Sequence, residues 1–91
     1  MHAVTVAVNL DPSRPEEAQE FLTSNVVPAV KQTPGIVSGY WLGSGEGRGI
    51  TVLLYENEQA AKAAADAVPN TPRPDFVTLD KIEVLEVLAQ I

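Results

Sequence analysis

The apolar residues of the chain change their spacing several times, and each change predicts a new element. Val4, Val6 and Val8 alternate with other residues, which predicts a β-strand over residues 3–10. The dipeptide Asp11-Pro12 ends this strand. The next apolar residues recur three or four positions apart, as on one face of a helix: Ala18, Phe21, Leu22, Val26, Ala29 and Val30.

The first helix carries signals at both ends and in its middle. Ser13 and Glu16 have the spacing of a capping box, in which Ser13 caps the helix and Glu16 reaches back to it. Pro28 predicts a kink or a restart, because it has no N–H and crowds the carbonyl group of Ser24. Thr33-Pro34-Gly35 then stops the helix.

The rest of the chain predicts one more helix and three strands. Glycine occupies every other position from Gly43 to Gly49, which predicts a mobile hairpin loop between antiparallel neighbours. Asn57 predicts the N-cap of an alanine-rich helix over residues 58–68. The last strand should bend near Asp80-Lys81. The three strands are predicted at residues 36–42, 50–55 and 76–88.

The predicted order of elements is βαββαβ. This order is typical of the ferredoxin-like α+β class, in which two helices cover one face of a four-stranded antiparallel sheet. A chain of 91 residues is long enough for one such domain, spanning residues 1–91.

Both faces of the predicted sheet carry apolar residues, although the two helices can cover only one of them. A face that met water would alternate apolar with polar residues along each strand. In the first strand Val4, Val6 and Val8 oppose Ala3 and Ala7; in the second Ile36, Tyr40 and Leu42 oppose Val37 and Trp41; in the third Ile50, Val52 and Leu54 oppose Leu53 and Tyr55.

The uncovered face predicts a partner. A four-stranded face covers roughly 400 Å² at about 4.8 Å between strands. This is about the largest apolar patch that a soluble monomer tolerates. Two such faces stacked across a twofold axis would cover each other. We therefore predict a homodimer whose two sheets pack face to face.

Charge and composition exclude several classes of function. The chain has 6 Lys and Arg against 12 Asp and Glu, a formal charge of −6, which argues against nucleic acid and anionic membranes as partners. It has no cysteine and no His, Asp and Glu cluster with metal-ligand spacing, so we expect no metal and no cofactor. The N-terminus has no basic leader, and no apolar stretch approaches ~18 residues, so we expect a cytoplasmic protein.

Three local sequences accompany the predicted order of elements. Pro28-Ala29-Val30 precedes Thr33-Pro34-Gly35, Gly39-Tyr40-Trp41-Leu42 lies in the second strand, and residues 54–60 lead into the second helix. In these respects nearly the whole chain resembles the dimeric α+β barrel superfamily, which includes antibiotic-biosynthesis-monooxygenase-like domains. The resemblance implies a barrel built by two subunits. It does not settle an activity, because the superfamily includes cofactor-free oxygenases, haem degraders, isomerases and members with no known activity.

The chain departs from the family where the chemistry of the family lies. Oxygenase and haem-degrading members often have a tryptophan where this chain has Tyr55, ahead of Glu56. Haem degraders also have a histidine on or after the second helix, and residues 60–68 contain none. The first-strand asparagine of the family aligns near Val8, one position before Asn9. These departures disfavour haem degradation and leave an oxygenase without its usual groups.

Four residues are candidate ligand contacts, and no catalytic residue is assigned. Tyr40 and Trp41 are adjacent in a strand, so one of them should face the helices, where it would stack on a planar ligand or fill the core. Tyr55 would donate a hydrogen bond to a ligand or keep its hydroxyl group in water. Asn9 would orient a ligand oxygen or end the strand through turn hydrogen bonds.

Two charged or titratable residues have weaker claims. His2 has the pKa range of an acid or base near neutral pH, but a residue beside a terminus is usually exposed. Arg48, in the glycine-rich loop, would contact an anionic ligand or lie in solvent.

Two hypotheses of function follow. The first is a homodimer that binds an apolar aromatic small molecule between helices and sheet and, if catalytic, is a cofactor-independent monooxygenase. The second is a non-catalytic dimeric module with a filled core. A pocket above ~300 Å³ between helices and sheet would favour the first hypothesis, and its absence would favour the second.

Overall fold

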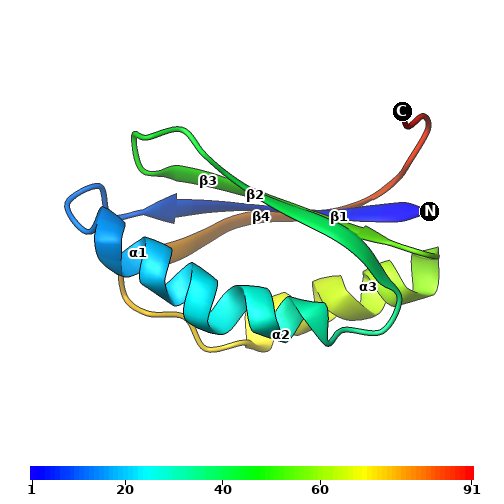
Figure 1. Cartoon of the computed structure of the whole chain (residues 1–91), viewed down its shortest axis with the longest axis horizontal. Coiled ribbons are helices and arrows are strands. Elements are labelled where there is room, and N and C mark those ends of the chain that lie inside the picture. Colours follow the sequence, from blue (N-terminus) through cyan, green and yellow to red (C-terminus); the bar gives the residue numbers. More distant parts are fainter.

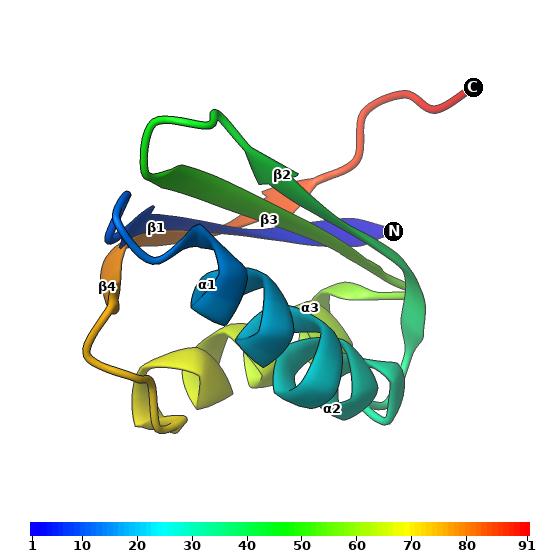
Figure 2. The ribbon, with the colours of Figure 1, turned by 60° about the vertical axis from the view of Figure 1, so that its left-hand side comes forward.

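The alternating valines of the first segment form a strand at the centre of the sheet. The computed structural model describes all 91 residues, and its four antiparallel strands lie in the order β2-β3-β1-β4 with the helices on one face (Figures 1 and 2). The predicted βαββαβ order and the ferredoxin-like class are confirmed. The elements are β1 (His2–Leu10), α1 (Pro15–Phe21), the π-helical turn η1 (Leu22–Val26), α2 (Val27–Lys31), β2 (Ile36–Gly43), β3 (Arg48–Tyr55), α3 (Glu58–Ala67), the 3-10 turn η2 (Val68–Asn70) and β4 (Val77–Glu86).

The first helical segment changes its hydrogen-bond pattern just before Pro28. Segments α1, η1 and α2 follow one another without a gap and are called the long helix below. The N–H of Val27 donates to the carbonyl group of Leu22, five residues earlier, which is the π-helical spacing. Pro28 has no N–H to donate and crowds the preceding turn, so the wider turn accommodates its ring. At the predicted kink or restart, the structure has a π-helical turn, after which the α-helical pattern restarts at Val27.

Of the two predicted N-terminal caps, the one on α3 is confirmed and the one on α1 is wrong. Asn57 caps α3 as predicted, since its side-chain oxygen accepts a hydrogen bond from the N–H of Ala60 at 2.8 Å. The predicted capping box at Ser13 is wrong, because no side chain caps α1. Both the N–H and the Oγ of Ser13 donate to Oδ1 of Asp11, at 2.9 and 2.6 Å. Ser13 therefore forms its hydrogen bonds within the Asp-Pro turn and is not available to cap the helix.

The core lies between the sheet and α3. On α3, Ala61 and Ala65 are buried, and their methyl side chains let the helix approach the strands closely. No residue of the long helix is buried, so its apolar side chains are at most half-buried. The strands contribute Val4, Val6, Leu53 and Tyr55 to the core.

A bulge in β2 changes which residues share a face. The pairing of β2 with β3 shifts at Val37, so that Ile36 packs against the core on the same side as Trp41. Tyr40 and Leu42 lie on the opposite face. The predicted grouping of Ile36 with Tyr40 and Leu42 is therefore wrong, because an inserted residue inverts the alternation of a strand.

A second bulge bends β4. Ala7 of β1 pairs with Lys81 and the next residue, Val8, pairs with Leu79, so Asp80 has no partner. The predicted bend near Asp80-Lys81 is confirmed.

Among the helices, none has the length and apolar character needed to cross a bilayer.

The face of the sheet opposite the helices is uncovered (Figure 1) and is called the open face below. Strand pairing assigns its residues, because partners in register point to the same side of a sheet. Its apolar residues are Ala3, Ala7, Tyr40, Leu42, Ile50, Val52, Leu54 and Leu85.

Candidate functional site

The two adjacent aromatic residues of β2 point to opposite faces, as predicted, and the structure shows which is which. Trp41 is half-buried on the helix side and packs against the core. Tyr40 lies on the open face and is 58% exposed. Of the pair, Trp41 is therefore the residue that a ligand on the helix side could contact.

Tyr55 is fully buried at the end of β3 on the helix side. Its hydroxyl oxygen lies 3.0 Å from Oγ1 of Thr33. The Thr33 hydroxyl group donates its only proton to the carbonyl group of Val30, at 2.7 Å, so Tyr55 must be the donor to Thr33. The phenol proton of Tyr55 is thus used to hold the end of the long helix against the sheet.

Asn9 is exposed near the end of β1, where it pairs with Arg48 and Thr78 on the open-face side. It therefore lies on the other side of the sheet from Trp41 and Tyr55. The structure does not bring the four candidate residues together into one site.

A cleft lies on the helix side, between the long helix and the residue that precedes β4. Its volume is about 390 Å³, and its walls include Phe21 and Phe76. The two rings meet edge to face, with centroids 6.4 Å apart and planes at 89°. None of the lining residues was a sequence candidate: Glu17, Glu20, Phe21, Ser24, Asn25 and Phe76. We call this the helix-side cleft.

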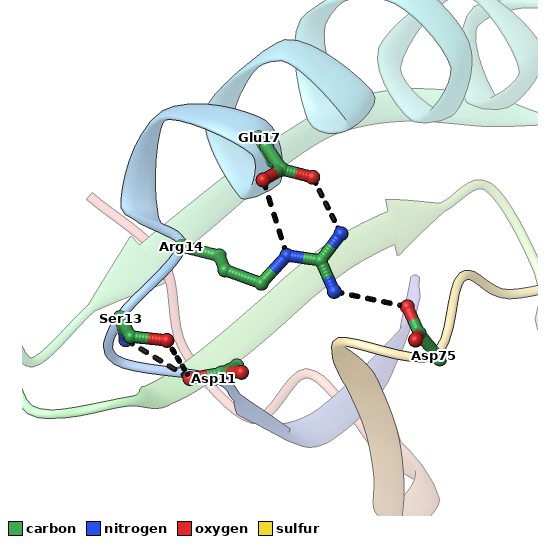
Figure 3. A network of polar contacts seen from close by, with 5 residues as sticks. All are labelled: Asp11, Ser13, Arg14, Glu17 and Asp75. Carbon is green, nitrogen blue, oxygen red and sulfur yellow. Dashed lines mark hydrogen bonds and ion pairs between the residues drawn. The ribbon is translucent and has the colours of Figure 1, made fainter.

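Arg14 fixes one wall of the helix-side cleft. Its guanidinium carbon lies 4.5 Å from the centroid of the Phe76 ring. Nε and Nη2 donate to the two carboxylate oxygens of Glu17, at 3.1 and 2.5 Å, and Nη1 donates to Asp75 at 3.1 Å (Figure 3). Arg14 therefore ties the start of α1 to the loop that leads into β4.

The same contacts shift the acid–base equilibria of the groups involved. The hydrogen bonds from Arg14 hold the pKa of Glu17 below its ordinary value of 4.5. Hydrogen bonds from Ser13 lower the pKa of Asp11 below 3.8. Glu17 in turn raises the pKa of Arg14 above its ordinary range. Exposed ion pairs of this kind contribute little stability, so their main effect is to position the wall.

His2 is far less exposed than a residue beside the N-terminus usually is. Its side chain is 18% exposed, with Nε2 3.6 Å from Oε2 of Glu58. Nδ1 is buried and has no hydrogen-bond partner. His2 lies two residues before Val4, which lies two residues before Val6, so the alternation of the strand already places His2 on the helix side.

No group of three or more His, Cys, Asp or Glu residues in the structure is arranged to hold a metal ion.

No family model and no curated protein matches the chain. Solved structures share its fold, among them the following three. The haem degrader MhuD from Mycobacterium tuberculosis, with two haems in its active site, has a TM-score of 0.75 and 20% identity over 100% of this chain and 99% of MhuD. The ActVA-Orf6 monooxygenase from Streptomyces coelicolor, in complex with nanaomycin D, has a TM-score of 0.62 and 19% identity over 99% and 89%. HapK from Hahella chejuensis has a TM-score of 0.64 and 17% identity over 99% and 95%.

These three neighbours are members of the dimeric α+β barrel superfamily. At this level of identity the likeness establishes the fold of the subunit. The fold expected from the sequence resemblance is therefore confirmed.

Proposed function

We propose that this chain forms a homodimer through its open face and that each subunit binds an aromatic small molecule in the helix-side cleft. The observation that carries the proposal is the cleft itself, about 390 Å³ with two phenylalanine walls. Small-molecule sites commonly measure about 300–1,000 Å³ and are lined mainly by apolar and aromatic side chains with a few polar groups. Here two of the six lining residues are apolar, and the polar ones are Glu17, Glu20, Ser24 and Asn25, so the cleft is more polar than most such sites.

The cleft lies at the rim of the helical layer, and no residue of the sheet lines it. It is therefore not the pocket between helices and sheet that would favour the first hypothesis, and the non-catalytic dimeric module stands as the alternative.

The exposed side chains of the open face support the dimer. Tyr40 is 58% and Leu42 54% exposed, and Ile50 and Leu85 are exposed beside them. Exposed apolar side chains that adjoin one another are typical of protein interfaces. The neighbours in fold come from a superfamily described as dimeric, which agrees with this assignment.

The lining of the cleft supports binding more than catalysis. The only titratable side chains of its lining are Glu17 and Glu20. Arg14 holds the carboxylate of Glu17 and lowers its pKa, which weakens it as a base.

Of the four sequence candidates, Trp41 faces the helix side but does not line the helix-side cleft, so none of the four is retained as a contact of the proposed ligand. Tyr40 and Asn9 face the proposed dimer interface, and the hydroxyl group of Tyr55 is engaged by Thr33.

Haem, the ligand of MhuD, does not fit the residues of this chain. Protein ligands of haem iron are histidine, cysteine, methionine or tyrosine side chains. None of these residue types lines the helix-side cleft. The single histidine, His2, lies beside Glu58 with its Nδ1 buried. We therefore assign no role to haem.

A second candidate function is that of a cofactor-independent monooxygenase, favoured by the likeness in fold to ActVA-Orf6. A phenolic ligand that loses its proton in the cleft could itself reduce dioxygen, so few protein groups would be needed. Measuring ligand binding without oxygen, and the reaction with oxygen, distinguishes a binding protein from a monooxygenase.

The test uses 1,4-dihydroxynaphthalene, a planar quinol. Without oxygen, the melting temperature should rise with quinol concentration, since a ligand that binds only the folded state stabilises it by mass action. Phe76→Ala should lose this shift, whereas Val37→Ala, on the exposed edge of β2, should keep it. An equal shift in both variants, or none in the wild type, refutes the cleft as the site. With oxygen present, a product that carries one oxygen atom from labelled dioxygen identifies a monooxygenase, whereas oxygen uptake that yields only 1,4-naphthoquinone and hydrogen peroxide refutes oxygenation.

A further inference from the structure

The long helix lines the helix-side cleft with carboxylate and aromatic side chains together. Glu20 and Phe21 lie three and four residues after Glu17, and Ser24 lies four residues after Glu20, which is the spacing of neighbours on one side of a helix. Phe76 lines the cleft from the loop that leads into β4. The cleft is therefore bounded by negative charge and by aromatic rings at once.

The two carboxylate groups of the cleft differ in their partners. The carboxylate of Glu17 accepts hydrogen bonds from both Nε and Nη2 of Arg14 (Figure 3). Glu20 takes part in none of the ion pairs of the structure, and its side chain is exposed. Glu20 therefore places a negative charge at the cleft without a cation of the chain to pair with it.

The wall of the cleft already binds one cation. The guanidinium carbon of Arg14 lies 4.5 Å from the centroid of the Phe76 ring, and the guanidinium group is held by Glu17 and Asp75. The face of an aromatic ring attracts positive charge. Arg14 brings one positive charge against the three carboxylates of Glu17, Glu20 and Asp75, so the surroundings of the cleft remain negative.

The charge of the whole chain acts in the same direction. A formal charge of −6 attracts cations to the surface and repels anions. The side-chain oxygens of Ser24 and Asn25 add hydrogen-bond acceptors to the lining. A protonated amino group carries three N–H donors and no acceptor, so it matches these oxygens and the carboxylate of Glu20.

We propose that the ligand of the helix-side cleft is an arylalkylamine, an aromatic ring joined by a short carbon chain to a protonated amino group. This inference rests on the cleft proposed above as a ligand site. The ring packs against Phe21 and Phe76, and the ammonium group donates to Glu20 and to the oxygens of Ser24 and Asn25. The phenylalanines select the ring, and Glu20 selects the charge.

Three ligands of similar shape measure the preference for charge. At pH 7, 1-naphthylmethylamine is a cation, 1-naphthylmethanol is neutral and 1-naphthoate is an anion. In calorimetric titrations at low salt the amine should bind at least about fivefold more tightly than the alcohol, the ratio that corresponds to about 1 kcal/mol for two charges about 4 Å apart in water. The anion should bind most weakly, and added salt should reduce the advantage of the amine.

A substitution of Glu20 locates the preference in the cleft. Glu20→Gln should lower the affinity for the amine to that for the alcohol and leave the affinity for the alcohol unchanged. Glu86→Gln is the matched control, because it removes the same charge at the exposed end of β4, whereas Phe76 precedes the start of that strand. This variant should keep the preference of the wild type. Both side chains are exposed, so the melting temperature without ligand should not change.

The outcomes separate the charge of the ligand from the cleft itself. Equal affinities for the amine and the alcohol, or equal losses in Glu20→Gln and Glu86→Gln, overturn the proposed amine. Binding of 1,4-dihydroxynaphthalene without binding of 1-naphthylmethylamine overturns the amine but leaves the cleft as a ligand site. If neither the quinol nor any of the three naphthalene compounds binds, the cleft is not a ligand site and both proposals fail.

Discussion

The two helical segments lie on the same face of the sheet but meet it in different ways. On α3, Ala61 is 0% and Ala65 9% exposed, because their small side chains let the helix lie close to the strands. The long helix buries no residue and presents larger side chains such as Phe21. Bulky side chains hold a helix away from a sheet, and the space beside them remains open as the helix-side cleft. One helix thus completes the core, and the other forms a wall of the candidate site.

The largest expected effect comes from filling the close contact beneath α3. Ala61→Leu should lower the free energy of unfolding by about 2–3 kcal/mol, because the added atoms have no room and force the helix outward. Ala18→Leu, on the half-buried face of the long helix, should cost about 1 kcal/mol or less. Chemical denaturation measures both. Equal costs would mean that the two helices pack alike. Ala63→Leu, on the exposed face of α3, controls for helix propensity.

Removing the aromatic wall should have a smaller effect on stability and a larger one on binding. Phe21→Ala should cost about 1–2 kcal/mol, below the 3–5 kcal/mol typical of a fully buried phenylalanine, because the ring is only half-buried. The shift in melting temperature produced by the quinol should disappear. A cost typical of a buried ring would show that Phe21 belongs to the core and not to an open cleft.

Removing the hydrogen bond that anchors the end of the long helix should lower the free energy of unfolding by less than removing the Phe21 ring. Tyr55→Phe removes the donor to Thr33 while it keeps the buried ring. The expected cost is about 1 kcal/mol, the usual net value of one hydrogen bond. Urea denaturation of Tyr55→Phe, Thr33→Val and the double variant measures the coupling between the two groups. Additive costs would show that the bond contributes nothing.

The smallest effect concerns pH and Arg14. The pKa of Glu17 is lower in the folded protein than its ordinary value of 4.5, so this pair stabilises the fold above that pH and ceases to do so as the pH falls through the folded pKa. The fall in melting temperature from about pH 7 to about pH 3 should therefore be smaller in Arg14→Met than in the wild type. Lys31→Met, on the same long helix, should show the wild-type dependence. An unchanged dependence in Arg14→Met would show that the pair is not formed in solution.

The order of elements could be predicted from the sequence because it depends on local spacing. The switch from alternation at Val4 and Val6 to helical spacing after Pro15 identifies β1 and the long helix without reference to distant residues. Asn57 acts on an N–H three residues away, and Pro28 acts within its own helix. Signals of this range are contained in the sequence itself.

The errors arise where two local signals compete or where a residue is inserted. Ser13 is within reach of both Asp11 and the helix, and the turn engages it. Val37 adds one residue to β2, and alternation alone does not show where a strand bulges. Phe21 and Phe76 were not predicted as a site, because their contact depends on how far the long helix lies from the loop before β4.

The pairing of β1 with β4 has a consequence for how the sheet folds. The two strands are neighbours in the sheet, although β1 is the first and β4 the last of the four strands in sequence order. Bringing them together closes a longer loop than the pairing of β1 with β3, and contacts between residues far apart in the sequence slow folding. The β1–β4 ladder is therefore expected to be the last part of the sheet to form.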